Sequence, residues 1–148
     1  MPGMMNYLLV IVLTLCPLCC VTSSSHDQIN AFEPYFLQII DGDIEFLDTH
    51  CRSSNDDFGN KTMTIHSSFS WKFRRNIGET TRFVCTFWWK TADGLIYKET
   101  EFDVFNQQIG DECGKNLFRT NRCFWSVTQS GFYFAKGQPF NWMFKRSW

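Results

Sequence analysis

The sequence predicts an all-β fold: a single, disulfide-stabilised antiparallel β-sandwich of about seven to eight strands. Three observations predict it. Apolar residues alternate with polar ones along much of the chain, which is the period of a strand with one buried face. Turn dipeptides containing Gly separate these runs at intervals of about 8–12 residues. The 148 residues, 44% of them hydrophobic, fit one domain with a dense core. No long window keeps a 3.6-residue period, so little or no helix is expected.

Residues 1–25 are expected to form a secretory signal peptide. They contain no Asp, Glu, Lys or Arg, and the apolar run from Tyr7 to Val21 is followed by small polar residues, the layout of a cleaved targeting segment. A spanning helix needs about 20 apolar residues, which this shorter run, interrupted by Pro17, does not supply. Cleavage is expected between Val21 and His26. Residues 26–148 then form a secreted, extracellular domain that is not inserted in a membrane.

Three strands are expected in the first half of this domain. The ranges Tyr35–Ile40 and Ile44–Cys51 are separated by Asp41-Gly42, a favourable hairpin or tight-turn dipeptide. Strict alternation of apolar and polar residues predicts the third strand, Ser68–Arg74. Its apolar positions, all on one face, are Phe69, Trp71 and Phe73.

The second half begins after Asn76-Ile77-Gly78 with the strand Thr81–Trp89, which is expected to be covered on part of both faces. One face carries Thr81, Phe83, Cys85, Phe87 and Trp89, and the other carries Arg82, Val84, Thr86 and Trp88. Asp93-Gly94 marks another turn. The last two strands, Cys123–Thr128 and Phe132–Ala135, are separated by Ser130-Gly131. The segment Asn106–Arg122 shows no clear pattern.

The cysteines predict two disulfides. The chain has seven cysteines, of which Cys16, Cys19 and Cys20 would leave with the signal peptide. The remaining four are even in number, lack a Cys-x-x-Cys spacing and belong to an oxidising compartment, so disulfides are favoured over zinc. Four cysteines allow three connectivities. Of these we favour Cys51 with Cys123 and Cys85 with Cys113, which would attach the unpatterned segment to the body.

One glycosylation site is predicted. Asn60-Lys61-Thr62 is an Asn-x-Thr sequon that follows a turn-rich stretch, where an acceptor is exposed. A glycan on Asn60 would place that edge of the domain in solvent.

Several function classes are disfavoured. Fourteen Lys and Arg against fifteen Asp and Glu give a net charge of −1, too weak to hold nucleic acid. His50 and His66 have no metal-ligand partner at a useful spacing, and neither a nucleophile elbow nor a phosphate loop is present. We therefore expect no enzyme, metal or cofactor. Asp56-Asp57 could bind calcium in principle, but an acidic turn that caps neighbouring backbone amides is the preferred interpretation.

The ordered motifs resemble the plant self-incompatibility S1 family, also called S-protein homologues. The run from His50 to Gly59 is similar to that family's HC-x-S-x-x-DD-x-G motif, with Asp56 and Asp57 as the acidic pair. The other matching residues are Phe73, Asn76, Gly78, Thr81, Phe83, Cys85, Phe102-Asp103-Val104-Phe105, Cys123-Phe124-Trp125, Gly131-Phe132-Tyr133 and Trp148. The resemblance implies a small secreted plant β-sandwich without catalysis or cofactor. Family members typified by pistil determinants are recognised at the surface of incompatible pollen.

Two functions follow as expectations. The first is an extracellular signalling ligand that presents three loops, Asn55–Asn60, Lys90–Gly94 and Asn106–Arg122, to a plant cell-surface receptor. The alternative is a lectin-like module that binds cell-wall carbohydrate. Trp88 and Trp89 are adjacent and must face opposite sides, so one of them is a candidate for stacking on a sugar ring. Trp71 and Trp125 are expected in the core. A secreted hydrolase would need a reactive carboxylate pair, which we do not find.

Overall fold

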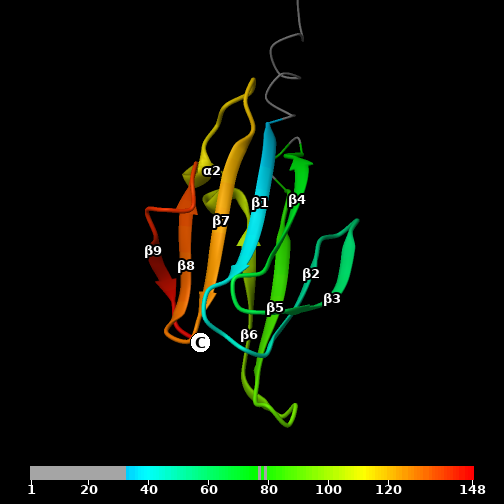
Figure 1. Ribbon diagram of the computed structural model, residues 1–148. Helices are drawn as coiled ribbons and strands as arrows, with labels where there is room; N and C mark the ends of the chain where they lie inside the picture. The colour runs from blue at the N-terminus through cyan, green and yellow to red at the C-terminus, as the bar shows by residue number, and fades with distance from the viewer. Residues whose placement is uncertain (1–32, 77, 79) are drawn as a thin grey trace, which may run out of the picture.

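The computed structural model describes residues 33–76, 78 and 80–148 (Figure 1). The signal peptide predicted for residues 1–25 lies outside the described residues. The described chain forms nine strands, more than the seven to eight expected, and one short helix. These are β1 (Pro34–Asp41), β2 (Leu47–Arg52), β3 (Asp57–Met63), β4 (Ser68–Arg74), β5 (Phe83–Lys90), β6 (Ile96–Phe105), α2 (Gln107–Cys113), β7 (Asn121–Thr128), β8 (Gly131–Lys136) and β9 (Met143–Arg146).

The strands form two sheets, so the all-β class predicted from the sequence is confirmed. One sheet has five strands in the order β4-β1-β7-β8-β9, and the other has four in the order β3-β2-β5-β6. The purely antiparallel expectation is wrong at one place, because β1 runs parallel to β7, with Leu37 opposite Cys123. Parallel neighbours require a long connection. Here the chain builds the whole second sheet between β1 and β7.

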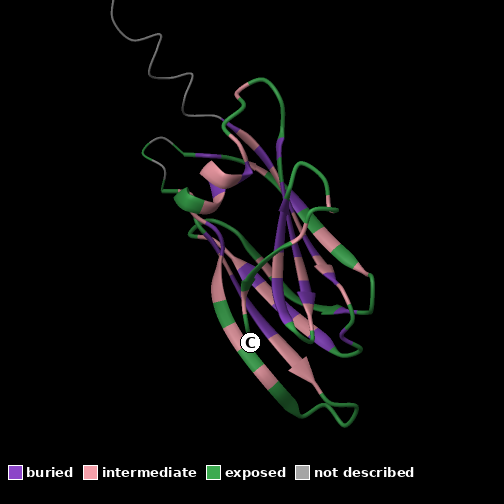
Figure 2. Cartoon of the chain, turned by 90° about the vertical axis from the view of Figure 1, so that its left-hand side faces the viewer, coloured by how far each residue is buried: buried purple, intermediate pink, exposed green. Residues whose placement is uncertain are grey.

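The core lies between the two sheets and is largely aromatic. More buried residues alternate with more exposed ones along β1, β2 and β4, as the sequence predicts, and Figure 2 shows such alternation along strands. Rings from opposite sheets meet directly: Phe87 and Phe132 lie 5.1 Å apart between ring centres, and Phe102 and Trp125 lie 5.2 Å apart. Trp71 and Trp125 are buried, which confirms their expected place in the core. Tilted and edge-to-face contacts of this kind stabilise the core beyond the burial of apolar area.

The two Asp-Gly turns have different roles. Asp93-Gly94 lies between the antiparallel neighbours β5 and β6, and Gly94 has a φ of 83°, so this dipeptide makes the expected hairpin. Asp41-Gly42 instead ends β1 and sends the chain into the other sheet. β2 therefore begins at Leu47 rather than Ile44, because residues 42–46 are needed to cross between the sheets.

The segment without a clear pattern contains α2. The side chain of Asn106 caps this helix by accepting a hydrogen bond from the backbone N–H of Ile109 at 3.0 Å. Seven residues are only two turns, too few to show a helical period in the sequence. No helix in the part of the chain that the structure describes is long and apolar enough to cross a membrane.

The disulfide pairing that we favoured is wrong. The structure pairs Cys51 with Cys85 and Cys113 with Cys123. Cys51 and Cys85 are opposite each other in the β2–β5 ladder, with their Cα atoms 4.1 Å apart. Cys123 is in the other sheet, where it holds the end of α2. The unpatterned segment is therefore attached to the body through Cys113, as expected, but by a bond to β7.

Candidate functional site

The loop between β2 and β3 carries the acidic motif and is closed by local hydrogen bonds. The backbone N–H of Ser53 donates to the carbonyl of Asp56 at 2.7 Å. In return, the Oγ of Ser53 accepts from the N–H groups of Asn55 and Asp56 at 3.2 and 3.0 Å. Serine and aspartate side chains favour such turns because they bond to nearby backbone groups. The loop is therefore held in one shape although its residues are exposed.

A second contact joins this loop to β2. The Nε2 of His50 lies 2.6 Å from the Oδ1 of Asp57, and the same oxygen accepts the N–H of Gly59 at 2.8 Å. Both donors favour the ionised carboxylate, so the Gly59 N–H and then the His50 ring hold the pKa of Asp57 below its ordinary value. Gly59 has a φ of 66°, a conformation that suits a glycine. Asp57 thus caps a backbone amide, whereas Asp56 bonds to Ser53.

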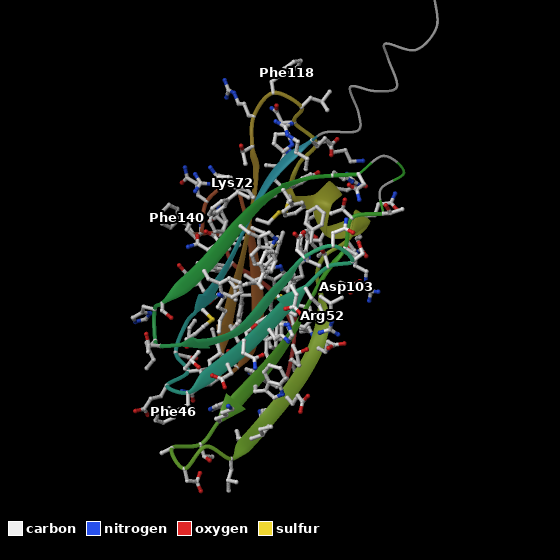
Figure 3. All side chains as sticks on the ribbon, turned by 90° about the vertical axis from the view of Figure 1, so that its right-hand side faces the viewer. Phe46, Arg52, Lys72, Asp103, Phe118 and Phe140 are labelled. Carbon is white, nitrogen blue, oxygen red and sulfur yellow. A yellow bond between two sulfur atoms is a disulfide. The ribbon has the colours of Figure 1, made fainter. Side chains whose placement is uncertain are left out.

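Charged pairs cross the outer face of the four-stranded sheet beside this loop. Arg52 of β2 donates to Glu101 of β6 at 3.0 Å, and Arg82, just before β5, donates to Asp103 at 2.7 Å. Figure 3 shows Arg52 and Asp103 on this face. Thr86 also donates to Glu101 at 2.6 Å. The Thr86 hydroxyl and then the Arg52 guanidinium lower the pKa of Glu101, which is therefore ionised at neutral pH.

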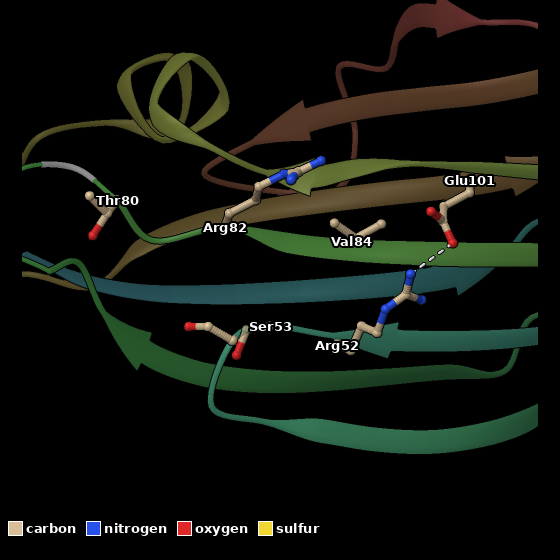
Figure 4. Close-up of a pocket in the computed structure, with 7 residues that line it drawn as sticks. Arg52, Ser53, Thr80, Arg82, Val84 and Glu101 are labelled. Carbon is tan, nitrogen blue, oxygen red and sulfur yellow. Dashed lines mark hydrogen bonds and ion pairs between the residues drawn. The ribbon is translucent and has the colours of Figure 1, made fainter.

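The two arginines border a pocket of about 410 Å³ (Figure 4). Arg52 contacts its carboxylate through one Nη, and Arg82 contacts its own through Nε. Neither guanidinium uses all of its N–H groups in contacts with the described residues. Further N–H groups on both are therefore free to bind a carboxylate or another anion. Glu101 and the hydroxyl groups can accept from donors on the same molecule. The lining residues are Arg52, Ser53, Ser54, Thr80, Arg82, Val84 and Glu101.

The remaining predicted residues lie in three separate places. Asn60 is exposed on β3, at one edge of the four-stranded sheet. Trp88 is half-buried on the outer face between Asp48 and Glu99. Trp89 is half-buried on the inner side. Neither tryptophan is a fully exposed platform of the kind that a lectin-like module would present.

The three loops expected to bind a receptor do not form one surface. Strand register places the start of β3 and the segment after β6 at the same end, because Arg52 pairs with Val84 and Phe83 pairs with Phe105. Lys90–Gly94 lies at the other end, beyond the pairing of Leu47 with Trp89. A single flat surface on a partner therefore cannot contact all three loops together.

The sequence reasoning missed the arginine pocket. Arg52, Arg82 and Glu101 are far apart in the sequence and come from different segments. The alternation in Thr81–Trp89 did place Arg82 and Thr86 on the face opposite the core. This outer-face position was the sequence signal that could have revealed the pocket, because charged residues on the outer side of neighbouring strands tend to form cross-strand pairs.

Two packed sheets, two disulfides and a charged outer face define a small, disulfide-bonded β domain. The chain belongs to the plant self-incompatibility protein S1 family, whose model matches residues 38–148. The family resemblance seen in the sequence is thus confirmed.

Individual relatives are distant. The chain is 30% identical over 82 residues to S-protein homolog 2 of Arabidopsis thaliana, covering 55% of this chain and 47% of the relative. It is 32% identical over 85 residues to self-incompatibility protein S1 of Papaver rhoeas, covering 57% and 54%. The chain thus spans about half the length of these curated relatives. A solved structure of SPH (self-incompatibility protein homologue) proteins has the same fold, with a TM-score of 0.51, 18% identity and coverage of 73% and 90%.

Proposed function

We propose that this protein is secreted and acts outside the plant cell as a signalling ligand or recognition protein for a cell-surface receptor. The apolar, uncharged layout of residues 1–25 and the two disulfides support secretion. The structurally similar SPH proteins are described as small, highly stable and secreted proteins from plants. The Papaver relative is named a self-incompatibility protein, and a related role in recognition is proposed here.

The arginine pocket is the observation that carries this proposal. A closed loop fixes Ser53, and the Cys51–Cys85 disulfide holds β2 against β5, so the pocket keeps its shape before a partner binds. A preformed site binds with a smaller loss of conformational entropy. Arginine is enriched among residues that dominate binding energy at protein interfaces. The pocket is therefore suited to a carboxylate of a receptor.

A binding assay on oxidised mature protein tests the proposal. Labelled protein is offered in parallel to wall-free plant protoplasts and to isolated wall polysaccharide, with reduced protein as a control. The variant Arg52→Gln/Arg82→Gln removes both guanidiniums. Its matched control, Lys72→Gln/Lys136→Gln, removes two positive charges from exposed positions of the five-stranded sheet.

We expect saturable binding of the oxidised protein to protoplasts. The double arginine variant should bind at least about tenfold more weakly, equal to about 1.4 kcal/mol, and the lysine control should bind like the original protein. If the arginine variant and the lysine control bound equally well, the arginine pocket would not contribute to receptor binding. Saturable binding to polysaccharide alone would instead support the lectin-like alternative.

A further inference from the structure

The β5–β6 hairpin carries an exposed apolar surface at the end of the molecule away from α2. Leu95, Ile96 and Tyr97 are 66%, 55% and 60% exposed, and Phe46 beside them is 39% exposed. With the half-buried Trp89 these residues form what we call the hairpin patch. Figure 3 shows Phe46 near the projecting hairpin.

Two chain segments meet at the hairpin patch. The N–H of Lys90 donates to the carbonyl of Phe46 at 2.8 Å, and Lys90 pairs with Ile96 across the hairpin. The rings of Trp89 and Tyr97 pack edge to face at 4.9 Å. In this register Phe46 and Ile96 flank Lys90 on the outer face of the hairpin, whereas Tyr97 lies with Trp89 on the inner face. The exposed apolar side chains therefore surround the end of the hairpin.

The hairpin patch is also anchored by contacts to the rest of the fold. Trp89 lies 5.8 Å from Trp148 between ring centres, which joins the patch to the aromatic core. At the tip, the N–H of Thr91 donates to the carbonyl of Leu95, and the N–H of Gly94 donates to the carbonyl of Thr91, both at 2.9 Å. A fixed apolar surface loses little conformational entropy on binding, and such clusters mark interaction sites.

The charges around the patch define the partner. Glu45, Asp93 and Glu99 are exposed beside it and form no ion pair with the residues that the structure describes. The nearby Lys98 instead lies over the rings of Trp89 and Tyr97. The three carboxylates outnumber the single ammonium group of Lys98, so the rim has a net negative charge. It would be repelled by an anionic lipid surface and by the same rim on a second copy of this chain.

We propose that the hairpin patch docks into an apolar groove with a basic rim on a protein partner. The proposal rests on the function proposed above, because it assigns this surface to the cell-surface receptor. The arginine pocket lies near the other end of the four-stranded sheet, so the two surfaces contact different parts of that receptor.

The test compares two apolar variants in the protoplast assay. The first, Leu95→Ser/Ile96→Ser/Tyr97→Ser, replaces the three most exposed residues of the patch. The second, Phe140→Ser/Phe144→Ser, removes exposed aromatic residues on and just before β9 of the five-stranded sheet; these are 74% and 57% exposed. Near-ultraviolet circular dichroism confirms that both variants keep their tertiary structure.

The patch variant should bind at least about tenfold more weakly, as expected for anchors at the centre of an interface, and the aromatic control should bind within about twofold of the original protein. Protease treatment of the protoplasts should abolish binding. The charge reversal Glu45→Lys/Glu99→Lys should slow association and weaken its dependence on salt, because it removes the attraction to a basic rim.

The outcomes separate the two proposals. If the original protein does not bind protoplasts, the proposed function fails and this inference fails with it. If the original protein and the patch variant bind equally well, only the inference fails. Sedimentation with neutral or anionic vesicles, or self-association in analytical ultracentrifugation that the patch variant abolishes, would overturn the choice of a protein partner.

Discussion

Arg75 organises the polar side chains buried near α2. It donates to Glu33 at 3.1 Å and to Asp111 at 2.9 and 3.0 Å. The hydroxyl of Tyr35 donates to Glu33 at 2.8 Å and lies 2.9 Å from the carbonyl of Gly114. Burial and the neighbouring carboxylate raise the pKa of Tyr35, so it stays protonated. These contacts join the start of β1 to the segment after β4 and to α2.

The variant Arg75→Met should lower the free energy of unfolding by about 3–5 kcal/mol, because removing one partner of a buried pair leaves the other charge unpaired. Arg75 is 3% exposed and Glu33 is 8% exposed. Denaturation by urea measures the change. The control Arg52→Gln breaks an exposed pair and should cost at most about 1 kcal/mol. If both variants lost a similar amount of unfolding free energy, burial of the Arg75 pair would not be the reason for its contribution to stability.

Asp41 provides a prediction about pH. Its side chain is fully buried, and although Oδ1 accepts the N–H of Ile44 at 2.9 Å, burial raises its pKa. The folded state therefore binds this proton more tightly than the unfolded state does, so the contribution of Asp41 to stability falls as pH rises above about 3.9, the ordinary pKa of aspartate.

The variant Asp41→Asn keeps an acceptor for Ile44 and carries no charge. Relative to this variant, the original protein should lose stability as the pH is raised from 4 to 7. Urea midpoints across this range measure the difference. A constant difference between the two proteins would show that Asp41 has the same pKa in both states.

At the scale of elements, the two disulfides should stabilise the fold unequally. Cys51–Cys85 spans 34 residues and Cys113–Cys123 spans 10. By loop-closure entropy, they contribute about 4 and about 3 kcal/mol. The pair Cys51→Ala/Cys85→Ala should therefore unfold at lower urea than Cys113→Ala/Cys123→Ala. The reverse order would mean that attaching α2 matters more than restricting the unfolded chain.

The edge strand β3 leads to a prediction about the proposed glycan. Asn60 is exposed on this strand, which is an edge strand of the four-stranded sheet. A glycan there would hinder edge-to-edge pairing between molecules. The secreted Asn60→Gln variant should have a lower mass than the secreted original protein, because it lacks the glycan. It should also associate more readily at high concentration, as measured by light scattering. Thr62→Ala, which keeps Asn60 but destroys the sequon, should behave identically. If only one of the two variants associated more readily, the cause would be the substituted side chain rather than the loss of the glycan.

For the whole molecule, secretion and oxidation should leave a defined product. The mature N-terminus, sequenced from secreted material, should lie just after the cleavage region between Val21 and His26. The same material should contain no free thiol under denaturing, non-reducing conditions, because both disulfides would be formed. A chain that begins at Met1 would contradict the signal peptide, and two or more thiols would contradict the disulfides.

The sequence by itself determined the fold class and the family. Alternation along Ser68–Arg74 and Thr81–Trp89 is a local consequence of strands with one buried face, so it can be read without knowing which strands are neighbours. The motif from His50 to Gly59 can be read in the same way. Such patterns depend only on residues close together in the chain.

Only the tertiary structure decided which segments meet. The parallel pairing of β1 with β7 placed Cys123 in the other sheet from Cys51, which overturned the disulfide pairing that we favoured. The arginine pocket and the hairpin patch likewise combine side chains from separate strands. Contacts of this kind depend on strand order and register, and the alternation of a single strand carries no information about its neighbours.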